Sequence, residues 1–194
     1  MRSWVKWGLP VSIVVLLAGA GGGVVLADQV YREPVRGNVP EVPPETAEPA
    51  VAVESPGGVK YTAGAAQHPD QRAVMVVLDN HFRSINTRNY DLWKSTVVPS
   101  KWAELPKDKW MRDYGSTEDL DMTVHRIDTG PDGSLAVLLT FKSFQEVEHA
   151  PANVPSTCLE WNLVYPMVLD ESGRSLRLDT SKLPNSALVQ ECRE

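Results

Sequence analysis

The sequence has few cysteines, few histidines and no cluster of basic residues. Only 2 cysteines and 4 histidines occur among its 194 residues. A zinc site built on cysteine needs four ligands within reach, so this supply disfavours one, and the cysteines lack the CxxC spacing of a redox pair. The net charge is −6 at pH 7. An acidic protein repels phosphate backbones, so nucleic acid is not an expected partner.

The short signatures of common enzyme classes are also absent. The sequence contains no nucleophile elbow, no phosphate-binding glycine loop and no HExxH, which disfavours the corresponding hydrolase, nucleotide-binding and metalloprotease chemistry. Glu146, Glu148 and His149 lie in one polar segment, which we interpret as a solvated acidic loop instead of a metal site. The sequence therefore predicts neither a cofactor nor a metal.

One long apolar segment is present, at the N-terminus. Arg2 and Lys6 precede an uncharged run that ends at Ala27. A helix of about 20 apolar residues spans the ~30 Å hydrocarbon core of a bilayer, and the preceding cations favour a cytoplasmic N-terminus. We therefore expect residues 1–27 to be a single-pass anchor in the cell membrane, with the rest of the chain extracellular. The alternative is a signal peptide cleaved after Ala27, which gives a secreted protein.

Residues 28–69 are rich in proline. They hold 7 of the 15 prolines, with acidic and small residues between them. Because such a segment has few apolar side chains to bury, it is predicted to be a disordered linker. The apolar triplet at 51–53 is too short to change that prediction. The linker is expected to join the anchor to a folded domain over residues 70–194.

The folded domain shows both helical and strand periodicity. Apolar residues recur at helical spacing after Asp70, a favourable N-cap, and Asp79 and Arg83 are spaced to pair across one helical turn. The predicted helices cover 73–86, 90–98 and 101–114, the last interrupted at Pro106, and the predicted strands cover 120–128, 135–144, 158–169 and 175–179. Helices followed by a four-stranded meander predict an α+β domain with its helices on one face of an antiparallel sheet.

This order of elements resembles the nuclear transport factor 2-like superfamily over about residues 70–180. The resemblance rests on the opening helix Ala73–Asn86, the junction Asn89–Asp91 and the strand segment Trp161–Tyr165. The superfamily includes ketosteroid isomerase and polyketide cyclases, and the resemblance implies a cone fold, in which helices pack on one face of a curved sheet. Its members include enzymes, ligand binders and scaffolds, so no activity follows from the fold alone. Anchored cone domains also occur in Gram-positive secretion and transport assemblies, which implies other membrane or cell-envelope proteins as partners.

Cys158 and Cys192 are expected to form one disulfide, because an exported domain with two cysteines usually carries one bridge. Closing a loop of this length contributes roughly 4 kcal/mol through the entropy of the unfolded chain. Along the alternating strand, Cys158 points to the same side as Glu160 and Asn162, away from Trp161. We therefore predict that the bridge holds the C-terminal tail against the outer side of the sheet.

Two interpretations of the candidate site residues remain open. His81 lies in the apolar stripe of the first helix, where it is either an acid or base inside the cone or a core histidine hydrogen-bonded to a neighbour. Trp93, Trp102, Trp161 and Tyr165 either line a pocket for an apolar ligand or belong to the ordinary core.

The sequence favours a membrane-tethered extracytoplasmic domain with a non-catalytic role, as an accessory or scaffold subunit or as a small-ligand binder. The alternative is an isomerase, dehydratase or cyclase that acts on a small apolar substrate inside the cone, with His81 as the candidate catalytic residue. A cone filled with aromatic side chains and without polar groups would exclude the enzyme. An open cavity that holds a histidine and a carboxylate would favour it.

Overall fold

The computed structural model describes residues 51–183 and 186–193. The predicted anchor at Met1–Ala27 and the linker up to residue 50 lie outside the described residues. Within the described part of the chain, no helix is long and apolar enough to cross a membrane.

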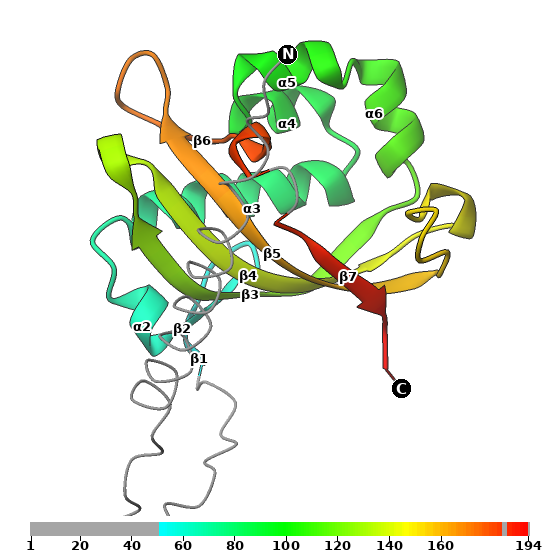
Figure 1. Ribbon diagram of the computed structural model, residues 1–194, viewed down its shortest axis with the longest axis horizontal. Helices are drawn as coiled ribbons and strands as arrows, with labels where there is room; N and C mark the ends of the chain where they lie inside the picture. The colour runs from blue at the N-terminus through cyan, green and yellow to red at the C-terminus, as the bar shows by residue number, and fades with distance from the viewer. Residues whose placement is uncertain (1–50, 184–185, 194) are drawn as a thin grey trace, which may run out of the picture. The chain divides into compact units, whose positions relative to one another are not determined.

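The centre of the domain is a seven-stranded, mostly antiparallel, curved sheet (Figure 1). Its strands are β1 (Val51–Glu54), β2 (Lys60–Thr62), β3 (Glu118–Thr129), β4 (Leu135–Phe144), β5 (Cys158–Leu169), β6 (Leu176–Leu178) and β7 (Leu188–Glu191). Strands β3 to β6 form an antiparallel meander, β2 joins it parallel to β3, and β1 pairs with β2. The predicted meander is therefore confirmed, and the two long strands at 135–144 and 158–169 have the predicted bounds.

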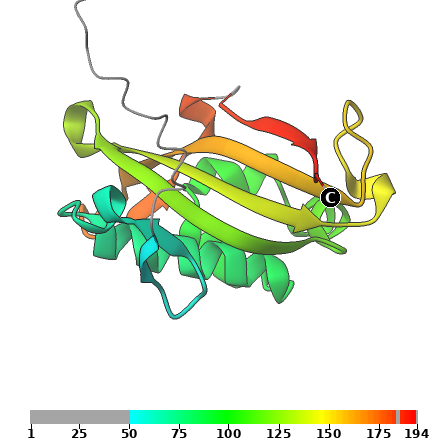
Figure 2. The same cartoon turned by 90° about the horizontal axis from the view of Figure 1, so that it is seen from below.

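The main helices lie on one face of this sheet, as Figures 1 and 2 show. The helices are α2 (Ala63–Ala66), α3 (Gln71–Asn86), α4 (Tyr90–Thr96), α5 (Pro99–Glu104) and α6 (Lys107–Tyr114). The apolar stripe of α3 is buried, with Val74 and Leu78 in one core cluster with Val137 and Leu139 of the central strand β4. The inward side chains of β4 from Leu135 to Phe141 are apolar and buried where the helices cover the sheet, and this confirms the predicted α+β domain with helices on one face.

The predicted boundary between linker and domain was wrong, because residues 51–69 belong to the fold. Strand β2 pairs with β3, and the side chains of Val59 and Tyr61 are 0% exposed. Burial of two such side chains stabilises the domain by about 1.5–3 kcal/mol each. Apolar residues that are few but fully buried therefore hold this segment on the sheet, although its composition is that of a linker.

The predicted pair between Asp79 and Arg83 was also wrong. Asp79 accepts hydrogen bonds from the Ser55 hydroxyl at 2.5 Å and from the Gly57 amide at 3.2 Å. The Arg83 guanidinium instead donates to the side chain of Asn80. Asp79 thus fixes the turn between β1 and β2 to helix α3, which further explains why the N-terminal segment is ordered.

The disulfide between Cys158 and Cys192 is present, with Cα atoms 5.4 Å apart. The predicted place of the tail was wrong, however. Residues Leu188–Glu191 form strand β7, which pairs antiparallel with the first half of β5, and the Cys192 amide donates to the Cys158 carbonyl at 3.1 Å. The tail therefore widens the sheet within its own plane and does not lie across its outer side, because its backbone groups find partners on the open edge of β5.

Candidate ligand-binding site

A hollow of about 270 Å³ opens between the helix-bearing face of the sheet and helix α6. We call it the inner hollow. Its apolar walls are the aromatic side chains of Tyr114, Phe141, Trp161 and Tyr165. Ligand pockets are typically about 300–1,000 Å³ and mostly apolar, with a few polar groups that orient the ligand. The inner hollow lies just below this range in volume, and its mostly apolar lining has the character of a site for a small molecule.

A chain of hydrogen bonds fixes the indole ring of Trp161 in this wall. Its Nε1–H donates to the Ser143 hydroxyl at 2.8 Å, and that hydroxyl donates to Gln145 Oε1 at 2.8 Å. The Gln145 amide then donates to the Ser156 carbonyl at 2.6 Å. Ser143 and Gln145 are both buried. Because every member of this chain is paired, the indole is held in one orientation before any ligand binds.

Asp119 supplies the buried carboxyl group of the inner hollow. It is 3% exposed, and no described residue donates a hydrogen bond to its carboxyl oxygens. Its backbone is clamped by the side chain of Asn86, which accepts from the Asp119 amide at 2.7 Å and donates to the Asp119 carbonyl at 2.8 Å. Burial raises the pKa of Asp119 to about 7, and the charge of Arg88 partly opposes the shift. Near neutral pH this carboxyl group is therefore present in both protonation states.

Arg88 reaches this site through an unusual backbone conformation. It has φ of +56° at the end of α3, where glycine is normally favoured. The amides of Arg88 and Asn89 make the two hydrogen bonds of a Schellman motif, at 3.1 Å and 2.8 Å. The guanidinium donates to the carbonyls of Gly115 at 3.0 Å and Asn86 at 2.5 Å. The arginine thus ties the end of α3 to the segment that leads into β3 and places a positive charge near Asp119.

Tyr114 and Tyr165 complete the polar lining of the inner hollow. Burial raises the pKa of Tyr114 to about 12 and that of Tyr165 further, and the negative charge of Asp119 contributes to both shifts. Both phenols therefore remain protonated at neutral pH and close enough to Asp119 to feel its charge. Two hydroxyls and one carboxyl group can meet a polar group on a bound molecule.

His81 is buried and lies behind Tyr165, with the two rings 5.7 Å apart. Its Nδ1 lies 2.9 Å from the Thr96 hydroxyl, which itself donates to the Trp93 carbonyl at 2.8 Å. Because that hydroxyl has a single proton, the imidazole donates from Nδ1. Burial lowers the pKa of His81 to about 4, so the ring is neutral at pH 7. This geometry fits a core histidine hydrogen-bonded to a neighbour, the second of the two interpretations of His81.

A second hollow of about 230 Å³ lies on the far side of Tyr165. We call it the lysine hollow, because Lys101 and Lys109 line it together with His81 and Trp93. Tyr114 and Tyr165 line both hollows, and the two spaces therefore adjoin at these rings.

The four aromatic candidate residues from the sequence do not lie in one site. Trp161 and Tyr165 line the inner hollow, and Trp93 lines the lysine hollow with 4% of its surface exposed. Trp102 lines neither hollow. It is 39% exposed on α5, and its indole donates to the Lys94 carbonyl at 3.1 Å. Asp119 was not among the candidate residues in the sequence.

Of Glu146, Glu148 and His149 in the polar loop after β4, one lines the inner hollow. His149 lines the hollow, and its Nδ1 lies 2.6 Å from the Ser116 hydroxyl. Glu146 lies 3.8 Å from the same ring. Among the described residues, no three histidine, cysteine or acidic side chains are grouped so that they could hold a metal ion.

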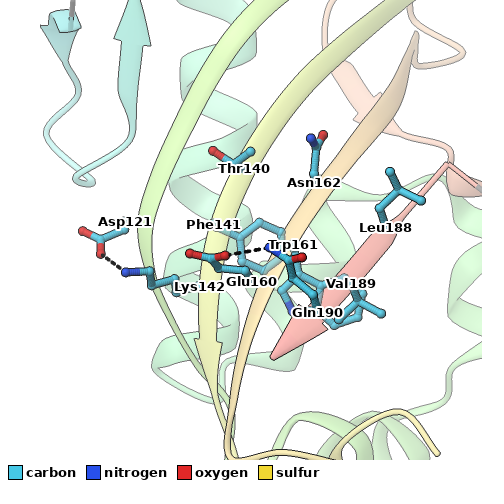
Figure 3. Close-up of a pocket in the computed structure, with 10 residues that line it drawn as sticks. All are labelled: Asp121, Thr140, Phe141, Lys142, Glu160, Trp161, Asn162, Leu188, Val189 and Gln190. Carbon is cyan, nitrogen blue, oxygen red and sulfur yellow. Dashed lines mark hydrogen bonds and ion pairs between the residues drawn. The ribbon is translucent and has the colours of Figure 1, made fainter. Parts of the chain in front are cut away.

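A third hollow, which we call the outer groove, lies across β4, β5 and β7, as Figure 3 shows. It has about 400 Å³, and its lining combines polar residues such as Thr140 with Phe141 and Trp161, which also line the inner hollow. Its charged side chains have partners, since Lys142 lies 3.8 Å from Asp121 and Gln190 donates to Glu160 at 3.0 Å. The outer groove therefore lacks the unpartnered buried group that distinguishes the inner hollow.

No protein-family model, curated protein or solved structure matches this chain. The interpretation of its site therefore rests on the geometry of its own residues.

Proposed function

We propose that the domain binds a small, largely apolar molecule in the inner hollow and acts as a non-catalytic, membrane-tethered ligand-binding module of the cell envelope. The observation that carries this proposal is an aromatic hollow with a buried carboxyl group, Asp119, that has no hydrogen-bond donor among the described residues. The carboxyl oxygens of Asp119 are not among the fully buried unpartnered atoms of the described residues, so they are accessible from the hollow. A ligand that hydrogen-bonds to Asp119 would supply a donor that the described residues lack, while its apolar part covers the aromatic walls.

The tether and the family belong to the same proposal. The apolar run that ends at Ala27 supports a single-pass anchor or an exported protein, and the disulfide suits an oxidising compartment. The helices on one face of a curved meander support the nuclear transport factor 2-like resemblance. A ligand binder displayed outside the membrane would act together with other membrane or cell-envelope proteins.

A matched pair of leucine substitutions tests where the ligand binds. Leu163 lines the inner hollow and is buried, whereas Leu188 lines the outer groove and is 71% exposed. The probe is 1-naphthamide, a neutral aromatic molecule, titrated calorimetrically into the full chain in phosphatidylcholine nanodiscs, with empty nanodiscs as the blank. We expect Leu163→Phe to weaken binding by narrowing the inner hollow, and Leu188→Phe to leave the affinity unchanged. Loss of binding in Leu188→Phe alone would move the site to the outer groove.

A second function, an isomerase, dehydratase or cyclase, is favoured by the acid–base properties of Asp119. A pKa of about 7 lets one carboxyl group take and return a proton at neutral pH. The aromatic walls would hold an apolar substrate against it, and the phenols of Tyr114 and Tyr165 could donate to a developing negative charge. In this alternative Asp119, and not His81, is the catalytic residue.

Proton exchange at carbon distinguishes the enzyme from the binder. A cyclic ketone such as 2-tetralone exchanges its α-protons for deuterium in D₂O, and a general base in the hollow would accelerate this exchange beyond the buffer rate. Asp119→Asn would abolish the acceleration, whereas Asp108→Asn, at an exposed residue of α6 that lines neither the inner hollow nor the lysine hollow, would preserve it. Exchange at the buffer rate for the unmodified protein supports a binder.

A further inference from the structure

The two adjoining hollows differ in charge, and this difference indicates the kind of ligand. The inner hollow is lined by two acidic residues, Asp113 and Asp119, and by His149. The lysine hollow is lined by Lys101 and Lys109, with Glu104 as its one acidic residue. A molecule that extends from one space to the other past Tyr165 would therefore meet opposite charges at its two ends.

The two lysines do not have equivalent partners. The Lys101 ammonium lies 2.6 Å from the Glu104 carboxylate, and its side chain is only 16% exposed. That ion pair neutralises one positive and one negative charge at the rim. Among the described residues, the Lys109 ammonium has one hydrogen-bond partner, the Glu104 carbonyl, at a long 3.5 Å. Lys109 is therefore the uncompensated charge of the lysine hollow.

Neutral polar groups surround the same space. His81 lines it with Nε2 as the acceptor side of a neutral ring, because its proton is on Nδ1. The hydroxyl of Thr180 also lines it. An anion placed near Lys109 would find the ammonium and this hydroxyl as donors, whereas in the inner hollow an anion would face two carboxyl groups. Charge complementarity thus orients an anionic ligand in one direction only.

We infer that the ligand is a small anionic amphiphile, whose carboxylate, sulfonate or phosphate pairs with Lys109 in the lysine hollow while its apolar body extends along Tyr165 toward the inner hollow. This inference rests on the proposed ligand-binding function and specifies the chemical class of the ligand. Such a group is carried equally by a free organic acid and by an anionic lipid headgroup.

Two probes of the same shape but different charge test the inference. The anion 1-naphthoate and the neutral 1-naphthamide are titrated calorimetrically into the full chain in phosphatidylcholine nanodiscs. We expect naphthoate to bind more tightly than naphthamide. Lys109→Met should weaken naphthoate binding by about tenfold, the effect of losing one charge-assisted hydrogen bond, and should leave naphthamide binding unchanged. Lys107→Met removes a lysine of the same helix, α6, that is exposed like Lys109 but does not line the lysine hollow, and it should change neither affinity.

The outcomes separate this inference from the function on which it rests. If naphthamide binds as tightly as naphthoate and Lys109→Met changes neither, the anionic class is wrong and the ligand-binding function stands. An equal loss for both probes makes Lys109 a structural residue and also overturns the inference. If neither probe binds, the proposed function itself fails.

The source of the anion is tested by changing the lipid. In nanodiscs that contain phosphatidylglycerol, a headgroup in the lysine hollow would compete with naphthoate in the unmodified protein, and Lys109→Met would remove that competition. Equal naphthoate affinity in both kinds of nanodisc would assign the site to a free organic acid.

Discussion

Replacing Asp119 by asparagine should stabilise the domain at neutral pH. The buried carboxyl group has a pKa of about 7 in the folded protein, against 3.8 for an ordinary aspartate. Between these values the unfolded chain is ionised while the folded protein keeps its proton. Each pH unit in this interval lowers the free energy of unfolding by about 1.4 kcal/mol. Above pH 7 the accumulated loss is on the order of 4 kcal/mol.

Asparagine has nearly the same shape and cannot ionise, so Asp119→Asn removes this loss. We expect urea-induced unfolding, followed by tryptophan fluorescence, to give a variant that is more stable than the unmodified protein at pH 7.5, with a difference that shrinks toward zero at pH 4. Asp113→Asn, at an exposed position, should change stability little at either pH. A difference that does not vary with pH, or an Asp119→Asn variant that is less stable at pH 7.5, would refute the assignment of Asp119 as a buried, unpartnered carboxyl group.

His81 modifies the pH profile that this experiment records. Its folded pKa of about 4 lies below the ordinary 6.5, so the unfolded chain binds the extra proton between these values and stability rises with pH there. Over that interval the contributions of His81 and Asp119 have opposite signs and nearly equal slopes. In the unmodified protein the two residues together should therefore leave the free energy of unfolding nearly independent of pH over this interval. In Asp119→Asn the free energy of unfolding should rise by about 1.4 kcal/mol per pH unit.

Three further predictions concern other parts of the fold. His81→Asn keeps a donor at the position of Nδ1 toward Thr96 but cannot titrate. The free energy of unfolding in urea should therefore no longer show the fall of about 3 kcal/mol that His81 causes as the pH drops from 6.5 to 4. An unchanged pH slope would contradict the buried, neutral state of His81. Changing Cys158 and Cys192 together to serine should lower the free energy of unfolding by roughly 4 kcal/mol and expose the β7 amides to hydrogen exchange. Protection equal to that of the oxidised protein would show that strand pairing with β5 holds β7 without the disulfide. Gly57 lies in the turn between β1 and β2, and Gly57→Ala would place a Cβ 2.6 Å from the carboxyl carbon of Asp79. Hydrogen exchange over β1 and β2 should therefore become faster, and unchanged exchange would argue against the contact between Asp79 and this turn.

Strands β4 and β5 could be predicted because apolar residues dominate them. The sequence of β5 alternates, and that of β4 is apolar on both faces at its centre, although the residues of β4 alternate between buried and partly exposed in the structure. Helix α3 could be predicted for the same reason, since Val74, Leu78 and Ile85 lie on one buried stripe. Where one face of an element is apolar, sequence and burial carry the same information.

Asp119 could not be found in this way, because the start of β3 is irregular. The expected strand began at Leu120, one residue after Asp119, and its pattern did not show which side chains face the core. The register shifts between Leu120 and Thr123, with Asp121 at φ +54°. As a result Leu120 is 42% exposed while the preceding Asp119 is buried. A bulge changes which side chains face the core, and nothing in a run of acidic residues indicates its position.

The N-terminal strands and the tail were missed for a different reason. Residues 51–62 contain Pro56, Gly57 and Gly58, which have the composition of a linker, and the segment is short. Its order depends on hydrogen bonds to Asp79 and on pairing with the edge of β3, both distant in sequence. Strand β7 likewise depends on the open edge of β5. Pairing at the edge of a sheet is set by tertiary contacts, which a local pattern does not contain.

The most direct test of ligand binding in the inner hollow is the response of the tryptophan indole resonances to a neutral probe. Trp161 lines both the inner hollow and the outer groove, whereas Trp102 is exposed on α5 and lines none of these spaces. In a ¹H–¹⁵N titration with 1-naphthamide, with the two indole peaks assigned by single Trp→Phe variants, we expect the Nε1–H peak of Trp161 to shift with saturation and that of Trp102 to stay in place. The same shift is expected in Leu188→Phe, because Leu188 lines the outer groove and not the inner hollow. A Trp161 shift that is lost in Leu188→Phe, or a saturating shift of Trp102 with Trp161 unmoved, would contradict the inner hollow as the binding site.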